Sequence, residues 1–558
     1  MAIIDTRRNQ MYPVLDAAQI ATASRFASGP ARDFAPGEPI FTIDATAGPS
    51  WLVLRGSIEV TRRDGLNGSV PVLTELPGQF SGEISQLSGR GSLAEGHAGP
   101  AGCTALPFDP AHLRALLIGS AELGEIVMRA FILRRVALLE AGSSGAVLVG
   151  RPGMPDLVRL QNFLRRNSYP FTVLDASDDD KGRALIERLG VRTEELPLLV
   201  CPKGGLLRHP TDAEAGAFLG ITPKLDTTRV YDVAVVGAGP AGLATAVYGA
   251  SEGLSVIVLD QRAFGGQAGA SARIENYLGF PTGISGLALT ARAFNQALKF
   301  GAELAIPVEV AKLDCDARLE DPSAPLLLHL THGETIRART VVIASGARYR
   351  PLAVPNLAQF ESAGVSYWAS AIEAKLCEGQ EIALVGAGNS AGQATVFLAP
   401  QVKKLHLIVR GKGLEASMSR YLIDRIAALP NVMLHTGCEI VALAGDAATG
   451  LTGATFRYRA GGDTVERALH HVFLFIGADP NADWLRGCVD LDDKGFVVTG
   501  AACKEGNARL PLETSLPGIF AIGDVRAGST KRVAAAVGEG AAAVAQIHSV
   551  LGGIVSRA

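Results

Sequence analysis

Two glycine-rich turns carry the strongest chemical signal in this chain. One lies in residues 233–242, VAVVGAGPAG, and the other in residues 382–389, IALVGAGN. Each follows an apolar run that is typical of a buried strand. Glycines at this spacing let a pyrophosphate approach the backbone and face the amides at a helix N-terminus. One such turn is weak evidence, but two in one chain predict two dinucleotides bound side by side.

The first turn has a suitable acidic partner. The strand predicted at residues 255–259 ends in Asp260, 23 positions after Gly237, where a carboxylate suits ribose hydroxyls. Strand, turn, helix and acid agree, which disfavours the alternative of an unrelated glycine-rich loop. The residues expected to hold the first nucleotide are Gly237, Gly239, Pro240, Ala241, Gly242 and Asp260.

Composition indicates a multidomain α/β protein. The chain has 558 residues, 48% of them apolar, with 64 glycines, which fits three or four domains with many tight turns. A net charge of −3 and a pI near 6.4 give no basic surface for nucleic acid. The ten histidines are scattered, so no metal site is predicted.

The apolar runs, the first residues and the cysteines all favour a cytoplasmic protein. Glycines and charges interrupt the apolar runs short of a membrane span, and residues 1–10 lack the apolar core of a signal peptide. We therefore expect a cytoplasmic protein without a membrane partner. None of the seven cysteines falls in a C-x-x-C pair, which leaves most of them as reduced core or surface thiols.

The first 141 residues resemble a cyclic nucleotide-binding domain. Short strands separated by glycine turns are predicted from about residue 34 to 105, followed by a helix near 121–140. The segments similar to that family's β-roll are residues 34–41, 51–60 and 77–83.

The phosphate-binding arginine of that family is missing from its usual place. The resemblance implies an arginine nine or ten residues after Glu83, where this chain has Ser92 and Leu93. Arg90 is a substitute if the loop is shortened. Two hypotheses stay open: a cyclic nucleotide site, or a roll reused for assembly or autoinhibition.

A second unit follows a linker at residues 141–145. Its runs predict the order β-α-β-α-β-β-α, and Leu196-Pro197-Leu198 resembles the cis-proline loop of the thioredoxin fold, although Pro197 also suits a plain structural turn. The redox turn of that fold would lie at residues 150–156, where no cysteine stands, and Cys201 has no local partner. Docking or scaffolding is therefore expected rather than thiol chemistry.

From Tyr231 to about Leu551 the chain resembles low-molecular-weight thioredoxin reductase. The segments that carry the resemblance are residues 265–267 (GGQ), 275–279 (ENYLG), 344–347 (ASGA), 386–391 (GAGNSA), 475–481 (FIGADPN), 523–525 (GDV) and 531–533 (KRV). This family implies two Rossmann-like dinucleotide-binding domains, with FAD in the first. The predicted fold is thus α/β: a cyclic nucleotide-binding-like β-roll, a thioredoxin-like α/β domain and two Rossmann-like domains.

The resemblance implies further FAD contacts. Gln267 and Asn276 would lie at the flavin end, and Asp524 near the ribityl chain or pyrophosphate, with a helix cap as the alternative or additional role. Arg532 and Val533 would present donors to the isoalloxazine edge, which stabilises reduced flavin. The full added set is Gly266, Gln267, Asn276, Ala344, Gly346, Gly523, Asp524, Arg532 and Val533.

The second turn would bind the nicotinamide nucleotide. Its strand, residues 406–409, ends at Arg410 rather than at an acid, so a 2′-phosphate is not rejected. NADPH is favoured and NADH is possible, because the family's last arginine is replaced by Glu415; Arg420 either assists or is solvated. The implied residues are Gly386, Gly388, Asn389, Ser390, Ala391, Arg410, Lys412, Ile476 and Gly477.

The main departure from the family lies just before the second turn. Residues 364–366 match the flank of the family's C-x-x-C, but its cysteines fall on Trp368 and Ala371. Cys377 follows as a single thiol, for which apolar packing is the better interpretation. Hydride transfer from NAD(P)H to FAD needs no cysteine, so it stays predicted, and no catalytic residue is assigned.

The leading hypothesis is an NAD(P)H-dependent flavoprotein that passes electrons to an unidentified small molecule or redox protein. Ferredoxin-NADP reductase activity, partner-specific disulfide reduction and a regulatory flavoprotein with a ligand-gated N-terminal domain are the alternatives. The family implies a homodimer. The expected domains are residues 1–141, 142–226, 227–350 (FAD, first part), 351–478 (nicotinamide nucleotide) and 479–558 (FAD, second part).

Overall fold

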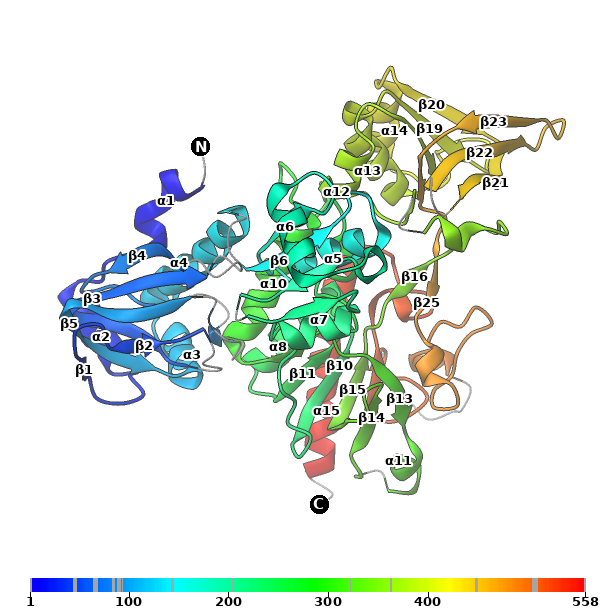
Figure 1. The fold of residues 1–558 in the computed structure, drawn as a ribbon. Coiled ribbons are helices and arrows are strands. Elements are labelled where there is room, and N and C mark those ends of the chain that lie inside the picture. Colours follow the sequence, from blue (N-terminus) through cyan, green and yellow to red (C-terminus); the bar gives the residue numbers. More distant parts are fainter. Residues whose placement is uncertain are drawn as a thin grey trace.

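The computed structural model shows four packed units (Figure 1). The residues that it describes are 3–43, 48–63, 69–82, 86–87, 92, 94–141, 145–202, 204–321, 323–361, 364–446, 450–503 and 510–555.

The first unit is an antiparallel sheet with helices beside it. Two long strands, β3 and β5, pair along most of their length, and the sheet order is β1-β5-β3-β4 with β2 on β5. Glycines with positive φ and register shifts bend these strands, as at Gly56. The elements are α1 (Ile3–Met11), α2 (Ala17–Ser24), β1 (Arg32–Phe34), β2 (Pro39–Phe41), β3 (Ser50–Arg63), β4 (Ser69–Glu75), β5 (Glu95–Phe108), α3 (Pro110–Gly119) and α4 (Ala121–Ala141).

The second unit has the predicted element order. Its sheet runs β7-β6-β8-β9, with β6 and β7 parallel and the other pairs antiparallel. The Leu196–Pro197 peptide bond is cis. The elements are β6 (Ala146–Gly150), α5 (Pro155–Arg166), β7 (Phe171–Asp175), α6 (Asp180–Leu189), η2 (Thr193–Glu195), β8 (Leu198–Val200), β9 (Leu206–Arg208) and α7 (Asp212–Phe218).

The third unit is a seven-stranded sheet built from two distant parts of the chain. Its order is β12-β11-β10-β15-β14-β13, and β26, far along the sequence, pairs with β15. Its elements are β10 (Val230–Val236), α8 (Pro240–Ser251), β11 (Val256–Leu259), α9 (Gly266–Gly269), α10 (Gly286–Phe300), β12 (Glu303–Ala305), β13 (Val310–Asp314), α11 (Asp316–Glu320), β14 (Leu326–Leu330), β15 (Thr335–Ile343), η5 (Asp483–Leu485), η6 (Gly500–Ala502), β26 (Ile519–Ala521), η7 (Gly523–Val525) and α15 (Val533–Val555).

The fourth unit is a parallel five-stranded sheet, β17-β24-β18-β19-β20, with an antiparallel sheet β21-β22-β23 beside it. The antiparallel pair β16 and β25 connects it to the third unit. The elements are β16 (Ala347–Tyr349), η3 (Leu357–Gln359), β17 (Val365–Ser366), α12 (Ala371–Leu376), β18 (Glu381–Val385), α13 (Asn389–Leu398), η4 (Ala399–Gln401), β19 (Lys404–Val409), α14 (Arg420–Ala427), β20 (Val432–Thr436), β21 (Cys438–Asp446), β22 (Gly450–Tyr458), β23 (Thr464–Ala468), β24 (His471–Leu474) and β25 (Ala478–Pro480).

The first and third units share one apolar core. Leu113, Leu116 and Leu117 of α3 are almost fully buried, and α3 lies against α10, where Phe294 and Leu298 are also buried. Burial of such side chains contributes about 1.5–3 kcal/mol each. The first unit is therefore packed firmly onto the third.

Three features differ from the sequence expectations. Cys315 and Cys488 form a disulfide that the sequence does not predict, while the other five cysteines are free, in line with the expectation for most of them. His406 and His435, which belong to a set that the sequence presents as scattered, meet on neighbouring strands with Nδ1 and Nε2 2.9 Å apart. Both pairings join segments distant in sequence, which spacing does not predict.

The third difference concerns α15. Within the described residues it is a helix with the length and mean hydropathy, 1.2 over Val533–Gly552, of a candidate membrane span. The expectation that apolar runs stop short of a membrane span fails here, because the valines and alanines, with Ile547 and Leu551, outweigh the single charge of Glu539 in the mean hydropathy. In the fold it packs along α8 and places Ala543, Val544 and Ile547 in the core.

Candidate active site

A cavity of about 2230 Å³ lies where the second, third and fourth units meet. Both glycine turns contribute to it, as do residues 151–155, which follow β6 of the second unit. Many of the predicted site residues line this cavity: Gly237, Gly239, Pro240, Ala241, Asp260, Gly266, Gln267, Asn276, Ala344, Gly346, Asn389, Ser390, Gly523, Asp524, Arg532 and Val533.

The first turn is built for close backbone approach. Gly237 has φ +111°, and a Cβ there would lie 2.2 Å from the carbonyl oxygen of Ala344. A Cβ on Gly242 would lie 1.9 Å from the oxygen of Gly237, so this third glycine serves helix packing. Gly239 begins α8 without a side-chain cap, which leaves the helix N-terminal amides facing the cavity.

Asp260 braces the same turn. One carboxylate oxygen accepts from Ala238 N at 2.8 Å, and the other accepts from Arg262 N at 2.9 Å and Ala263 N at 3.1 Å. The carboxylate thus fixes the turn and also lines the cavity. Each oxygen keeps lone-pair capacity for a ligand hydroxyl.

Asp524 lines the cavity from η7, next to Gly523, where an added Cβ would lie 3.0 Å from Ala241 Cβ at the start of α8. Burial raises the pKa of its carboxyl group, against the opposing charge of Lys531. Lys531 Nζ donates instead to the backbone oxygen of Asp524. Asp524 does not cap α15, which begins nine residues later at Val533.

Glu539 holds the turn that carries Asp524, a contact that the sequence does not predict. Glu539 of α15 accepts from Gly523 N at 2.6 Å and from Arg526 Nη2 at 2.6 Å. Both charged side chains are largely buried. Lys531, Arg532 and Val533 bring the N-terminus of α15 to the cavity, where its dipole favours negative charge.

The second turn repeats the first with a more open surface. Gly386 has φ +151°, and a Cβ there would lie 2.5 Å from the oxygen of Phe475. A Cβ on Gly388 would meet nothing within 4 Å. Asn389 Oδ1 accepts from Ser419 N at 2.7 Å, which holds the following loop over the start of α13.

The remaining predicted residues lie outside the described lining. Four of them form the turns behind the lining: Gly242, Gly386, Gly388 and Ala391. Two others, Arg410 and Lys412, are exposed beyond the end of β19. Ile476 packs against the core of the fourth unit, and Gly477 accepts from Arg350 N at 2.9 Å. Neither residue belongs to the cavity lining, although the adjacent Phe475 does.

Trp368 lies in the cavity wall at the first expected cysteine position. Its Nε1 donates to Glu373 Oε1 at 2.9 Å, and Glu373 also caps α12 through Ser370. Ala371, the second position, begins α12. Cys377 is fully buried, and burial raises the pKa of its thiol to about 11, which confirms a packing role.

The second unit contributes contacts that sequence reasoning also missed. Asn162 Nδ2 lies 3.3 Å from Glu373 Oε1, and Asn167 Nδ2 donates to Arg262 O at 3.0 Å. Arg166 Nη2 donates to Gly266 O at 2.8 Å. Charged and amide side chains at the end of a helix normally indicate a solvated surface, so the sequence carried no signal for these contacts.

This donor set fits a dinucleotide at the first turn. Gly239 and Gly266 lie close to each other at the first turn, since a Cβ on Gly266 would lie 3.1 Å from Gly239 Cα. The α8 and α15 N-termini offer amides to an anion, and the carboxylates of Asp260 and Asp524 accept from hydroxyls. The cavity continues to Asn389 and Ser390, so a second nucleotide at α13 would share it.

The comparisons with known proteins agree with this geometry. Residues 231–540 match the family described as pyridine nucleotide-disulphide oxidoreductase, which is more than half of the chain. The chain belongs to this family. Its cofactors are FAD and a nicotinamide nucleotide, as predicted.

The oxidoreductase resembles several curated enzymes. It is 34% identical over 335 residues to the F component of alkyl hydroperoxide reductase from Pseudomonas putida, covering 60% of each chain. It is 34% identical over 320 residues to thioredoxin reductase of Mycolicibacterium smegmatis, covering 56% of this chain and 94% of that protein. The chain thus spans about three fifths of the first relative and nearly all of the second.

A solved structure shows the same arrangement. Thioredoxin reductase of T. acidophilum aligns with a TM-score of 0.52 and 27% identity, covering 57% of the oxidoreductase and 98% of that chain. The likeness covers the length of the two dinucleotide-binding units.

Proposed function

We propose that this oxidoreductase transfers electrons from NADPH to an acceptor without a C-x-x-C dithiol. The observation that carries the proposal is Trp368 in the cavity wall, at the first cysteine position of the resemblance. Cys377, the nearest cysteine in sequence, is fully buried and held as a thiol by its raised pKa. A thiolate is the reactive form of cysteine, so neither position offers a sulfur relay.

Bound FAD would supply the chemistry, because a flavin accepts hydride from a nicotinamide and passes electrons onward. The protein's part is positional. Gly237 and Gly239 admit the pyrophosphate, Asp260 holds their turn, and Glu539 fixes the turn that carries Asp524. The N-terminus of α15 places partial positive charge at the cavity, which stabilises an electron-rich ligand.

The nicotinamide nucleotide would bind across the α13 N-terminus. Arg410 and Lys412 follow β19 and lie exposed near the second turn, with no acid at the end of that strand. Two cations there favour a 2′-phosphate, so NADPH is proposed over NADH.

A small acceptor such as a quinone is favoured over a protein. Three units of the same chain line the cavity, including residues 151–155 of the second unit. That segment stands at the redox-turn position predicted for a thioredoxin-like fold and contains no cysteine. A folded partner would have to displace this unit to reach the cavity.

The first unit is proposed to serve assembly. Gln86 fills the space over Gly82, since a Cβ on Gly82 would lie 2.2 Å from Gln86 Oε1. Glu83, Arg90 and Leu93, on which the cyclic nucleotide hypothesis depends, lie outside the described residues, while Ser92 hydrogen-bonds its neighbour Ala94. Cytoplasmic location, a homodimer and the five-segment domain division remain part of this proposal.

Stopped-flow mixing of the purified yellow protein with NADPH tests the proposed function. Fast loss of the oxidised flavin absorbance, followed by reoxidation with quinone or ferricyanide, is expected. A Cys377→Ala variant should keep quinone turnover within about twofold. Rapid turnover with thioredoxin, or loss of quinone turnover in Cys377→Ala with the flavin still bound, would overturn the dithiol-free route.

Two further acceptor results separate the alternatives. Turnover with ferredoxin that exceeds quinone turnover would identify a ferredoxin reductase. Absence of bleaching with both NADPH and NADH in a yellow protein would leave a regulatory flavoprotein.

A further inference from the structure

Arg166 is a partly buried cation that the second unit extends into the cavity at the first turn. It ends α5, lines the cavity, and donates from Nη2 to Gly266 O at 2.8 Å. Its Nε is fully buried without a hydrogen-bond partner among the described residues. Burial lowers the pKa of this guanidinium, which indicates that the charge lacks full compensation from the protein.

The surrounding charges leave room for an anion. Asp260 attracts Arg166, Arg262 repels it, and Tyr349 lies close enough to interact. Burial raises the pKa of Tyr349 to about 12, so its hydroxyl stays neutral. Asp260 already accepts three backbone amides, and it is the single carboxylate that acts on Arg166 among the described groups.

The guanidinium lies beside the phosphate-binding part of the first turn. Its carbonyl partner belongs to Gly266, whose missing side chain faces Gly239 Cα at close range. Gly239 in turn begins α8, where the helix amides face a pyrophosphate. Arginine is the side chain best suited to a buried phosphate, because its fork donates two hydrogen bonds at once.

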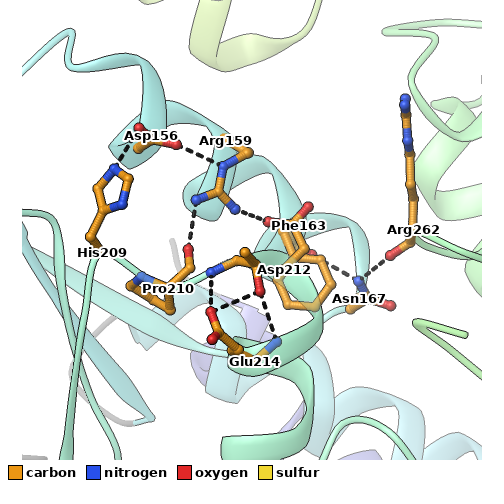
Figure 2. A network of polar contacts seen from close by, with 10 residues as sticks. Asp156, Arg159, Phe163, Asn167, His209, Pro210, Asp212, Glu214 and Arg262 are labelled. Atoms are coloured by element: carbon orange, nitrogen blue, oxygen red, sulfur yellow. Dashed lines mark hydrogen bonds and ion pairs between the residues drawn. The ribbon is translucent and has the colours of Figure 1, made fainter. Parts of the chain in front are cut away.

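A polar network, shown in Figure 2, holds helix α5, which ends at Arg166. Arg159 of α5 donates to Asp156 at 3.0 Å and to Pro210 O at 2.7 Å, and it pairs with Asp212 of α7. Asn167, directly after Arg166, bonds Phe163 O and Arg262 O, both at 3.0 Å. This helix is therefore anchored on both of its sides.

We propose that Arg166 completes the FAD site from outside the family's two dinucleotide-binding domains, pairing its guanidinium with the FAD pyrophosphate. The second unit would then help to retain FAD through a direct contact with the cofactor. The inference rests on FAD binding at the first turn and adds a residue that the family motifs do not contain.

The inference is tested by measuring the Kd of FAD for the deflavinated full-length protein. Flavin fluorescence reports the binding, and the titration is repeated at low and at high salt. Arg166→Ala and Arg166→Gln should weaken FAD binding about 10–100-fold, since each leaves the phosphate charge without its buried partner. Arg166→Lys should recover most of the affinity because it restores the charge. The salt dependence of binding should fall in the Ala and Gln variants.

Two controls separate charge from packing. Asn167→Ala loosens the same interface without removing a charge, and Arg183→Ala removes an exposed arginine that pairs with Asp180 on α6. Arg183→Ala should bind FAD within about threefold of the wild type, whereas Asn167→Ala, which loosens the helix that positions Arg166, should lose clearly less affinity than Arg166→Ala. FAD affinity in Arg166→Ala equal to the wild type, or an equal loss in Asn167→Ala, would overturn the inference. A wild-type protein that binds no FAD would instead overturn the proposed function.

Discussion

The two glycine turns share a backbone design but differ in what surrounds them. Gly237 and Gly386 both have positive φ and both leave no space for a Cβ. The first turn is enclosed by Asp260, Gly266 and the Arg166 side chain of another unit. At the second turn Gly388 faces open space, and its neighbouring cations Arg410 and Lys412 are exposed.

This difference separates a resident cofactor from an exchanging substrate. A nucleotide that stays bound through many turnovers gains from enclosure, because every contact slows its dissociation. A nucleotide that must leave after each hydride transfer needs an open path. The predictions below test this contrast, from the largest expected effect to the smallest.

Gly237→Ala should abolish FAD binding. The new Cβ would lie 2.2 Å from a backbone oxygen that cannot move without disturbing β15. The ratio of flavin to protein absorbance after purification measures the effect. Gly253→Ala is the matched control, since Gly253 also has positive φ but meets nothing within 4 Å, and it should keep the flavin. A yellow Gly237→Ala protein would contradict the assigned role of this turn.

Gly386→Ala should weaken NADPH binding about 10–100-fold while FAD stays bound. Its Cβ would lie 2.5 Å from Phe475 O, and relief of that contact moves the turn. The KM for NADPH in quinone reduction measures the effect, with Gly379→Ala as the unobstructed positive-φ control. Loss of FAD in this variant would remove the distinction between the two turns.

The strands and turns of both sites were predictable because their signal is local. Apolar runs followed by Gly237 or Gly386 specify strand, turn and helix within a dozen residues. Arg166, Glu373 and Glu539 act through partners about 100, 211 and 16 residues away, and no spacing rule relates them. An arginine in the last turn of α5 has the composition of a solvated helix end, which is why its role required the structure.

The sheet of the nicotinamide unit should be more sensitive to acid than the FAD sheet. Burial lowers the pKa of His435 to about 4, against about 6.5 in an unfolded chain. Neutral His435 therefore supports folding fully above pH 6.5, and this support is lost as pH falls toward 4. The expected loss at pH 5 is about 2 kcal/mol.

Thermal unfolding of the full chain at pH 7 and pH 5 measures this effect. His435→Gln should show a smaller drop between the two pH values than the wild type. His332→Gln, which changes an exposed histidine beside Glu334, should behave like the wild type. Equal drops in all three proteins would exclude His435 as the source.

Arg410→Ala should reduce the preference for NADPH over NADH about 2–5-fold, the smallest effect. An exposed cation contributes only about 1 kcal/mol or less to such a pairing. The ratio of kcat/KM for the two nucleotides is the measurement, and Arg459→Ala is an exposed control on the same unit. An unchanged ratio would assign the 2′-phosphate to another residue.

The leucine face of α3 also constrains how the protein is made. Leu113, Leu116 and Leu117 leave the ribosome roughly 180 residues before their partners Phe294 and Leu298. At about 5–20 residues per second, this face waits about 10–40 seconds for the α10 side chains, covered until then only by its own unit, chiefly α4. Glu539 is translated later still, so the turn that carries Asp524 gains its Glu539 contact only after both glycine turns have been synthesised.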